Sequence, residues 1–157
     1  MNPKMRVYSK IDAPKALLLG HDEVRAELVR AATEYGPVGL AAKRLAQICL
    51  PHFEREEKCV FPVLALLPHL ARGELRPDMA SVLPLVSDFT ARYDAIGMQH
   101  DSIHAAIDDL LQAAHREKKR EFAEFAYNLR VHERIEDEVI FPTVLMIGQY
   151  LREKLDC

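Results

Sequence analysis

The chain has 157 residues, of which 49% are apolar and 29% are charged, and its formal net charge is −3. This length predicts one domain over residues 1–157 with a buried core, and the small negative charge argues against nucleic acid and anionic membranes as partners. No stretch reaches the roughly 20 apolar residues that cross a bilayer. The opening MNPKMRVYSK also lacks the apolar core of a signal peptide, so we expect a cytoplasmic protein.

The first predicted helix runs from about residue 12 to residue 34. Asp12 is a suitable N-cap, and apolar residues follow it at helical spacing on one face. Gly20 lies beside the centre of that face and is expected to permit close approach of a neighbouring helix. Gly36 is expected to end the helix, and Pro37 to open the next one.

The second predicted helix runs from Pro37 to about Leu67 and contains two further prolines, Pro51 and Pro62. A proline removes a backbone donor and either kinks or ends a helix. The apolar stripe continues through both positions, and Pro142 recurs at the place that matches Pro62. We therefore predict kinks within one helix.

Two more helices are predicted at about residues 84–114 and 120–145, with a connection over residues 68–83 and a helical tail to Leu155. Apolar residues recur at helical spacing in both, and no strand-like alternation appears. Four long helices with mostly short loops predict an all-α fold. The expected architecture is an up-down antiparallel four-helix bundle built from two similar helix pairs, with its core over about residues 12–147.

One stretch of the chain occurs twice. Residues 52–62 read HFEREEKCVFP, and residues 132–142 read HERIEDEVIFP. The copies share a histidine, a glutamate four residues later and a terminal Phe-Pro pair. A His-Asp pair also precedes each copy, at residues 21–22 and 100–101. The chain is therefore predicted to hold two copies of one unit, each a histidine followed by an H-x-x-x-E motif.

The two motifs place histidine and carboxylate groups in the predicted core. Residues four apart on a helix differ by only about 40° in direction, so the two side chains of each H-x-x-x-E motif point the same way. A buried carboxylate costs several kcal/mol unless it is neutralised, and a cation bound by imidazole and carboxylate groups removes that cost. A lone inward histidine is more often a core residue, but the repeated set predicts a metal site formed by His21, His52, Glu56, His100, His132 and Glu136.

These motifs resemble those of the hemerythrin family, with its HHE cation-binding domain, over about residues 12–147. The resemblance implies an up-down four-helix bundle that holds two non-haem iron ions joined by an oxo or hydroxo bridge. It assigns the terminal ligands to His21, His52, His100 and His132, and the bridging carboxylates to Glu56 and Glu136. The second carboxylate stands four residues after its histidine, whereas the oxygen-carrying hemerythrins place it five residues after.

His104 is a further candidate ligand. It lies one helical turn after His100, and the oxygen carriers have H-x-x-x-H at this place. The first copy has no equivalent, because the residue four after His21 is Arg25. We expect His104 to be a ligand of one metal ion, and the alternative is a core histidine near the centre.

The cysteines indicate no other site. The chain has three, at Cys49, Cys59 and Cys157, and no C-x-x-C motif. An odd number without that motif argues against a disulfide framework and against a structural zinc site. Cys49 and Cys59 are expected to pack in the core.

Three functions fit this reading. The first is a di-iron protein that binds or senses O2 or NO, or that handles iron. The second is a di-iron enzyme that acts on peroxide or NO or repairs iron centres, and the third is a metal-stabilised bundle with a storage or structural role. Zinc and manganese remain alternatives to iron. The protein could be a monomer or a homodimer. The candidates thus include an enzyme as well as binding and structural proteins.

Overall fold

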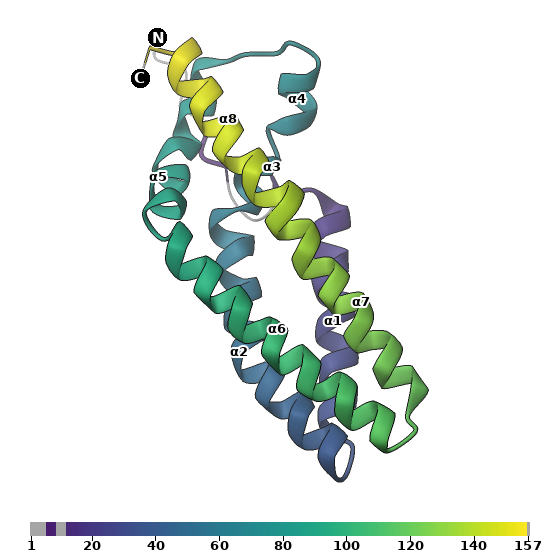
Figure 1. Cartoon of the computed structure of the whole chain (residues 1–157). Helices are drawn as coiled ribbons and strands as arrows, with labels where there is room; N and C mark the ends of the chain where they lie inside the picture. Colours follow the sequence, from purple (N-terminus) through teal and green to yellow (C-terminus); the bar gives the residue numbers. More distant parts are fainter. Residues whose placement is uncertain (1–5, 9–11, 157) are drawn as a thin grey trace.

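The computed structural model describes residues 6–8 and 12–156, and over these residues it is all-helical, with no strand (Figure 1). The predicted all-α class is therefore confirmed. None of the described helices is long and apolar enough to span a membrane. The elements are α1 Lys15–Ala32, α2 Pro37–Cys59, α3 Phe61–Leu64, α4 Leu67–Ala71, the 3-10 helix η2 Pro77–Val82, α5 Leu83–Ala91, α6 Tyr93–Arg116, α7 Arg120–Ile135, the π-helix η3 Glu136–Ile140 and α8 Phe141–Lys154.

The long helices form two helical hairpins, α1 with α2 and α6 with α7. Helices α1 and α2 are joined by a tight turn in which Gly36 has a positive φ of 81°. Pro37 opens α2, as predicted, but α1 already ends at Ala32, before Gly36. A residue with a side chain is strained at that φ, which explains the glycine. The predicted N-cap is wrong, because α1 begins at Lys15 after Pro14 and no side chain caps it.

The turns of the two hairpins lie at the same end of the molecule. The Glu117 carboxylate, just after α6, accepts a hydrogen bond of 2.8 Å from the backbone N–H of Val38 in α2. Lys119, just before α7, donates to Glu34 at 2.8 Å. Partial positive charge at the start of α2 therefore meets a carboxylate, and this interaction stabilises a helix N-terminus.

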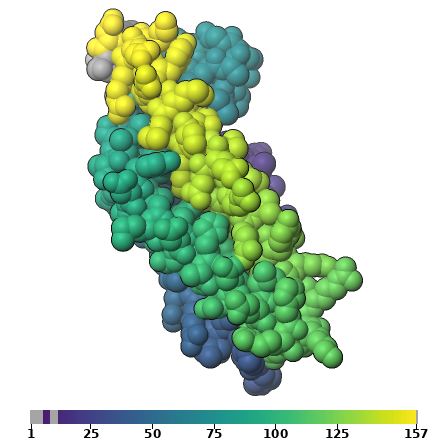
Figure 2. Space-filling model, in the orientation of Figure 1, coloured from purple at the N-terminus to yellow at the C-terminus, as the bar shows by residue number. Residues whose placement is uncertain are grey.

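Apolar side chains of α1, α2, α6 and α7 form one core beneath these turns, and a second core lies at the other end, where α3, α5 and α8 meet. Figure 2 shows the resulting elongated shape, with the α8 end of the chain far from the two turns. The largest fully buried side chains are Phe53, Phe122, Phe141, Leu28, Leu45, Leu66, Met79, Ile103, Ile107, Leu110, Leu129 and Leu151.

The predicted second helix is longer than the observed one. Helix α2 continues through Pro51 but ends at Cys59, and Pro62 falls in the first turn of the short helix α3. A proline is tolerated in a first turn, where its missing N–H has no partner to lose. Pro62 therefore marks the start of a new helix and not a kink.

The predicted third helix is divided at Arg92. Its backbone there, at φ −103° and ψ 4°, leaves the helical region and separates α5 from α6. The break has no proline or glycine to mark it in the sequence. Arg92 itself and neighbouring residues of α5 and α6 line a cavity beside α2.

The predicted fourth helix is continuous but contains the π-helical segment η3, just before Pro142. In an α-helix the proline ring would crowd the carbonyl of Glu138, four residues earlier. The wider π turn accommodates this, and such turns occur often at functional sites. The segment begins at Glu136, one of the predicted ligands.

Two glycines are expected to respond in opposite ways to alanine. A Cβ on Gly39 would lie 1.8 Å from the carbonyl oxygen of Glu34, whereas a Cβ on Gly20 would meet nothing within 4 Å. The predicted close approach at Gly20 is therefore wrong. Gly39→Ala is expected to lower the free energy of unfolding by about 2–3 kcal/mol, and Gly20→Ala to raise it by about 0.5–1 kcal/mol. Urea denaturation of both variants tests this pair, and equal effects would contradict it.

Candidate metal centre

The six ligands predicted from the repeat and its upstream histidines come together between the two cores. Helix α1 supplies His21, α2 supplies His52 and Glu56, α6 supplies His100, α7 supplies His132, and η3 supplies Glu136. His132 is partly exposed, and the other five are buried. Two groups of side chains, built from five of these residues and Glu133, place one ligand atom from each member within 4.8 Å of one another, and each group is a candidate metal position.

The first group consists of His21, His132 and Glu136. The Nε2 atom of His132 lies 2.7 Å from Oε1 of Glu136, and Nε2 of His21 lies 3.6 Å from the same oxygen. The ring of His21 stacks on Phe53 with centroids 4.2 Å apart, which fixes its orientation. Three ligand atoms thus face one small space.

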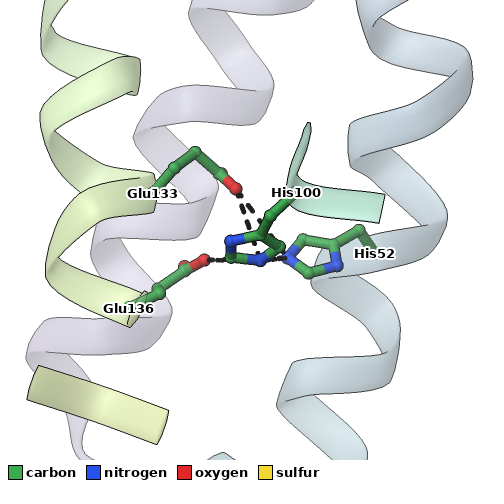
Figure 3. A group of neighbouring side chains, drawn as sticks. All are labelled: His52, His100, Glu133 and Glu136. Carbon is green, nitrogen blue, oxygen red and sulfur yellow. Dashed lines mark hydrogen bonds and ion pairs between the residues drawn. The ribbon is translucent and has the colours of Figure 1, made fainter. Parts of the chain in front are cut away.

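The second group consists of His52, His100, Glu133 and Glu136, and all four side chains point toward one another (Figure 3). The Nε2 atoms of His52 and His100 are 3.0 Å apart. Each lies 3.6 Å from Oε2 of Glu136. Glu133 approaches from α7, with its Oε2 atom 3.6 Å from Nε2 of His100.

Two carboxylates face both groups. Glu136 turns Oε1 to the first group and Oε2 to the second. Glu56 does the same, because its Oε2 atom lies 3.4 Å from His21 and its Oε1 atom 3.2 Å from His52. This arrangement can hold two cations with two carboxylates between them.

Buried polar atoms without hydrogen-bond partners converge on this space. Within the described part of the chain they include Nε2 of His21 and His132, both oxygens of Glu56 and Glu133, and Oε2 of Glu136. Buried polar atoms normally have hydrogen-bond partners, since an unsatisfied one costs about 1–3 kcal/mol. So many in one place fit metal ligation, and imidazole and carboxylate donors suit iron, manganese or zinc.

The charges of the metal-free centre follow from the same contacts. Burial alone lowers the pKa of His21, but the carboxylates of Glu136 and Glu56 outweigh it and raise this pKa to about 9. The same balance raises the pKa of His52 to about 11. Burial and the charge of Glu136 raise the pKa of Glu133 well above its usual range. Metal-free protein at neutral pH therefore carries protons on His21 and His52.

Metal binding is expected to release these protons, because a ligand must present a lone pair. Raised folded-state pKa values mean that the protons compete with the metal below those values, so metal affinity rises with pH. Each displaced proton adds about tenfold in affinity per pH unit between about pH 6 and pH 8. Zinc titrations with a pH indicator in weak buffer measure the release, and an affinity independent of pH would contradict it.

The second ring nitrogen of three histidines is held from outside the centre. Nδ1–H of His21 lies 3.3 Å from Oε1 of Glu57, which Arg25 contacts at 2.6 Å. Such a carboxylate fixes the ring and raises its basicity as a metal ligand. Neither Glu57 nor Arg25 is among the ligands predicted from the sequence.

His52 and His100 have equivalent contacts. Nδ1–H of His52 donates to Oε1 of Gln99 at 3.1 Å, and Arg55 donates to the same oxygen at 2.6 Å. Nδ1 of His100 lies 2.9 Å from Oδ1 of Asp137. In each ring the nitrogen left facing the centre is Nε2.

His104 lies at the edge of the centre, with 28% of its side chain exposed. Its Nε2 atom is 3.8 Å from Oδ2 of Asp137, and its ring centroid is 6.4 Å from that of His100. It forms a third, partly exposed group with those two residues. Among the described residues, it shares no candidate metal position with His52, Glu133 or Glu136.

Glu133 belongs to a candidate metal position but is not among the ligands predicted from the sequence. It follows His132 directly and lies three residues before Glu136, so both glutamates share a helix face. It also lies one turn after Leu129, which is fully buried in the core. A charged residue on a core stripe was the signal that could have identified it.

The comparison with family models agrees with this geometry. Residues 13–144 match the model described as the hemerythrin HHE cation-binding domain. Comparisons with curated proteins and with solved structures returned no match. The matched range covers most of the chain and contains both candidate metal positions, from His21 to Glu136. The resemblance inferred from the motifs is thereby confirmed, and the chain belongs to the hemerythrin HHE cation-binding domain family.

Proposed function

We propose that the protein is a non-haem di-iron protein that binds or senses O2 or NO. The observation that carries the proposal is the position of Glu56 and Glu136, which each face both groups of ligand atoms. The proposed working unit is a single domain, an up-down antiparallel four-helix bundle, in a cytoplasmic protein. Bound iron would supply affinity for diatomic ligands and electrons for their reduction.

Buried aromatic side chains would shield part of the centre from water. Phe53 and Phe61 lie 4.2 and 4.8 Å from the ring of His21, and Phe141 lies 5.1 Å from that of His100, measured between centroids. All three phenylalanines are buried. A dry, apolar shell of this kind strengthens electrostatic interactions at the ligands and limits solvent access.

The two positions differ in their number of protein ligands. The second would have two histidines, Glu133 and the two shared carboxylates. The first would have His21, His132 and the shared carboxylates, one ligand fewer. We therefore place the open coordination site, where a small molecule binds, on the side of His21 and His132.

The metal content and the response to gas test the proposal together. Protein prepared without chelator and loaded anaerobically with ferrous iron is expected to hold about two irons per chain. A single tightly held zinc would contradict it. A reversible change of the optical spectrum on adding O2 or NO would support binding or sensing, whereas irreversible conversion would favour the enzyme.

The variants Glu133→Gln and His104→Gln test which of these two residues is the remaining terminal ligand. The distances favour Glu133, so Glu133→Gln is expected to weaken one of the two metal positions by more than about 100-fold, beyond the effect of residues that only orient a ligand. His104 lies on the partly exposed side of Asp137, so the His104→Gln variant is expected to retain both metals. Chelator competition measures the metal affinity of both variants. A larger loss of affinity in His104→Gln than in Glu133→Gln would identify His104 as the terminal ligand.

One observation favours the enzyme as a second candidate. A cavity of about 300 Å³ lies against His52 and Glu56. This is roughly ten times the volume that one water molecule occupies in the liquid. A protein that handled only diatomic molecules would not need it.

A further inference from the structure

The cavity beside the metal centre lies between α2, α5, α6 and the start of α8. Arg92, at which the chain leaves the helical path between α5 and α6, is one of its lining residues. His52 and Glu56 form its inner end, and Phe89, Ile96 and Phe141 form apolar walls. Its volume of about 300 Å³ is in the range of small-molecule sites, which combine apolar walls with a few polar groups.

The remaining charged groups of the cavity, Arg55, Asp88 and Arg92, are at its exposed side. Arg92 pairs with Asp88 at 3.0 Å, so these two charges offset each other. Arg55 is exposed and donates to Gln99, and no carboxylate pairs with it in the part of the chain that the structure describes. The rim therefore carries one uncompensated positive charge.

We propose that this cavity binds a small organic monocarboxylate, with its apolar body against Phe89 and Phe141 and its carboxylate on Arg55. The arginine fork matches a carboxylate with two parallel hydrogen bonds, and aromatic walls suit a flat ring or a short aliphatic chain. The inference extends the proposed function, because two proposed metal ligands form the inner wall. Binding itself uses residues that need no metal.

Gln99 connects the bound carboxylate to the metal centre. Its Oε1 atom accepts hydrogen bonds from both Arg55 and His52. When a bound carboxylate accepts hydrogen bonds from Arg55, the hydrogen bond from Arg55 to Gln99 weakens. The hydrogen bond between Gln99 and His52 then changes as well. Occupancy of the cavity is therefore expected to shift the optical spectrum of the iron-loaded protein.

Calorimetric titration of the full chain with benzoate tests the site, first on metal-free and then on iron-loaded protein. One benzoate is expected per chain, and benzamide, which has the same shape without the charge, is expected to bind at least about tenfold more weakly. Arg55→Gln is expected to weaken benzoate binding by about ten- to a hundredfold. Arg44→Gln removes an exposed arginine of the same helix outside the cavity and is expected to bind like the wild type.

The same complex can be located through Cys59, which lines the cavity. Benzoate is expected to slow its alkylation by N-ethylmaleimide, measured by peptide mapping. Absence of saturable binding, equal binding of benzoate and benzamide, equal effects of the two arginine variants, or unchanged alkylation would each overturn the inference. Failure of the di-iron proposal would appear in the metal analysis instead and would leave benzoate binding to metal-free protein intact.

Discussion

Glu136→Gln is expected to lower the affinity of both metal positions by more than about 100-fold, the largest effect of any single ligand change. Residues that only orient a ligand typically cost 10- to 100-fold. Glu136 belongs to both candidate metal positions, with one carboxylate oxygen turned to each. Glutamine has only one oxygen, and its amide group would present a donor to the other cation.

The matched control for this variant is Glu138→Gln, two residues further along the same π-helical segment. Glu138 is exposed and pairs with Arg134 at 2.9 Å, and such surface pairs contribute at most about 1 kcal/mol. Metal analysis after dialysis against a chelator should show loss of metal from Glu136→Gln alone. If Glu136→Gln retains two metals per chain, Glu136 is not a bridging ligand.

Phe53→Ala is expected to lower the free energy of unfolding by about 3–5 kcal/mol, because it leaves a cavity where a fully buried ring was packed. Phe53 is fully buried in α2 and contacts the rings of His21, at 4.2 Å, and His132, at 5.9 Å. It therefore joins the apolar core to the metal centre. A loss of this size is a large share of the roughly 5–15 kcal/mol that stabilises a domain.

Urea denaturation of metal-free protein measures this loss without the contribution of bound metal. The matched control is Tyr35→Ala, since Tyr35 is 93% exposed in the turn between α1 and α2. Its effect is expected to stay within about 0.5 kcal/mol. A loss below about 1 kcal/mol for Phe53→Ala would show that the ring does not hold the core together.

The helical class, the turn at Gly36 and Pro37, and the gathering of the repeated ligands could all be predicted from the sequence. These features depend on local rules, namely helical periodicity and the backbone preferences of glycine and proline. The repeat then placed His52 and Glu56 on one face, as it did His132 and Glu136. Both pairs meet at the centre of the structure.

Proline alone did not predict where helices end. Helix α2 continues through Pro51, a new helix begins at Pro62, and a π turn precedes Pro142. The outcome depends on whether the packing around each site tolerates a missing hydrogen bond. The break at Arg92 has no proline or glycine to mark it in the sequence, and Arg92 lines the cavity beside the centre.

The sequence alone determined that histidine and glutamate pairs share helix faces, and tertiary structure decided which of them reach the centre. His100 and His104 differ by only about 40° around α6, yet one is buried at the centre and the other is 28% exposed beside Asp137. Glu133 comes to the centre from α7 instead. A helical pattern states which residues are neighbours on one helix, but the rotation of each helix against its partners follows from packing across the whole core.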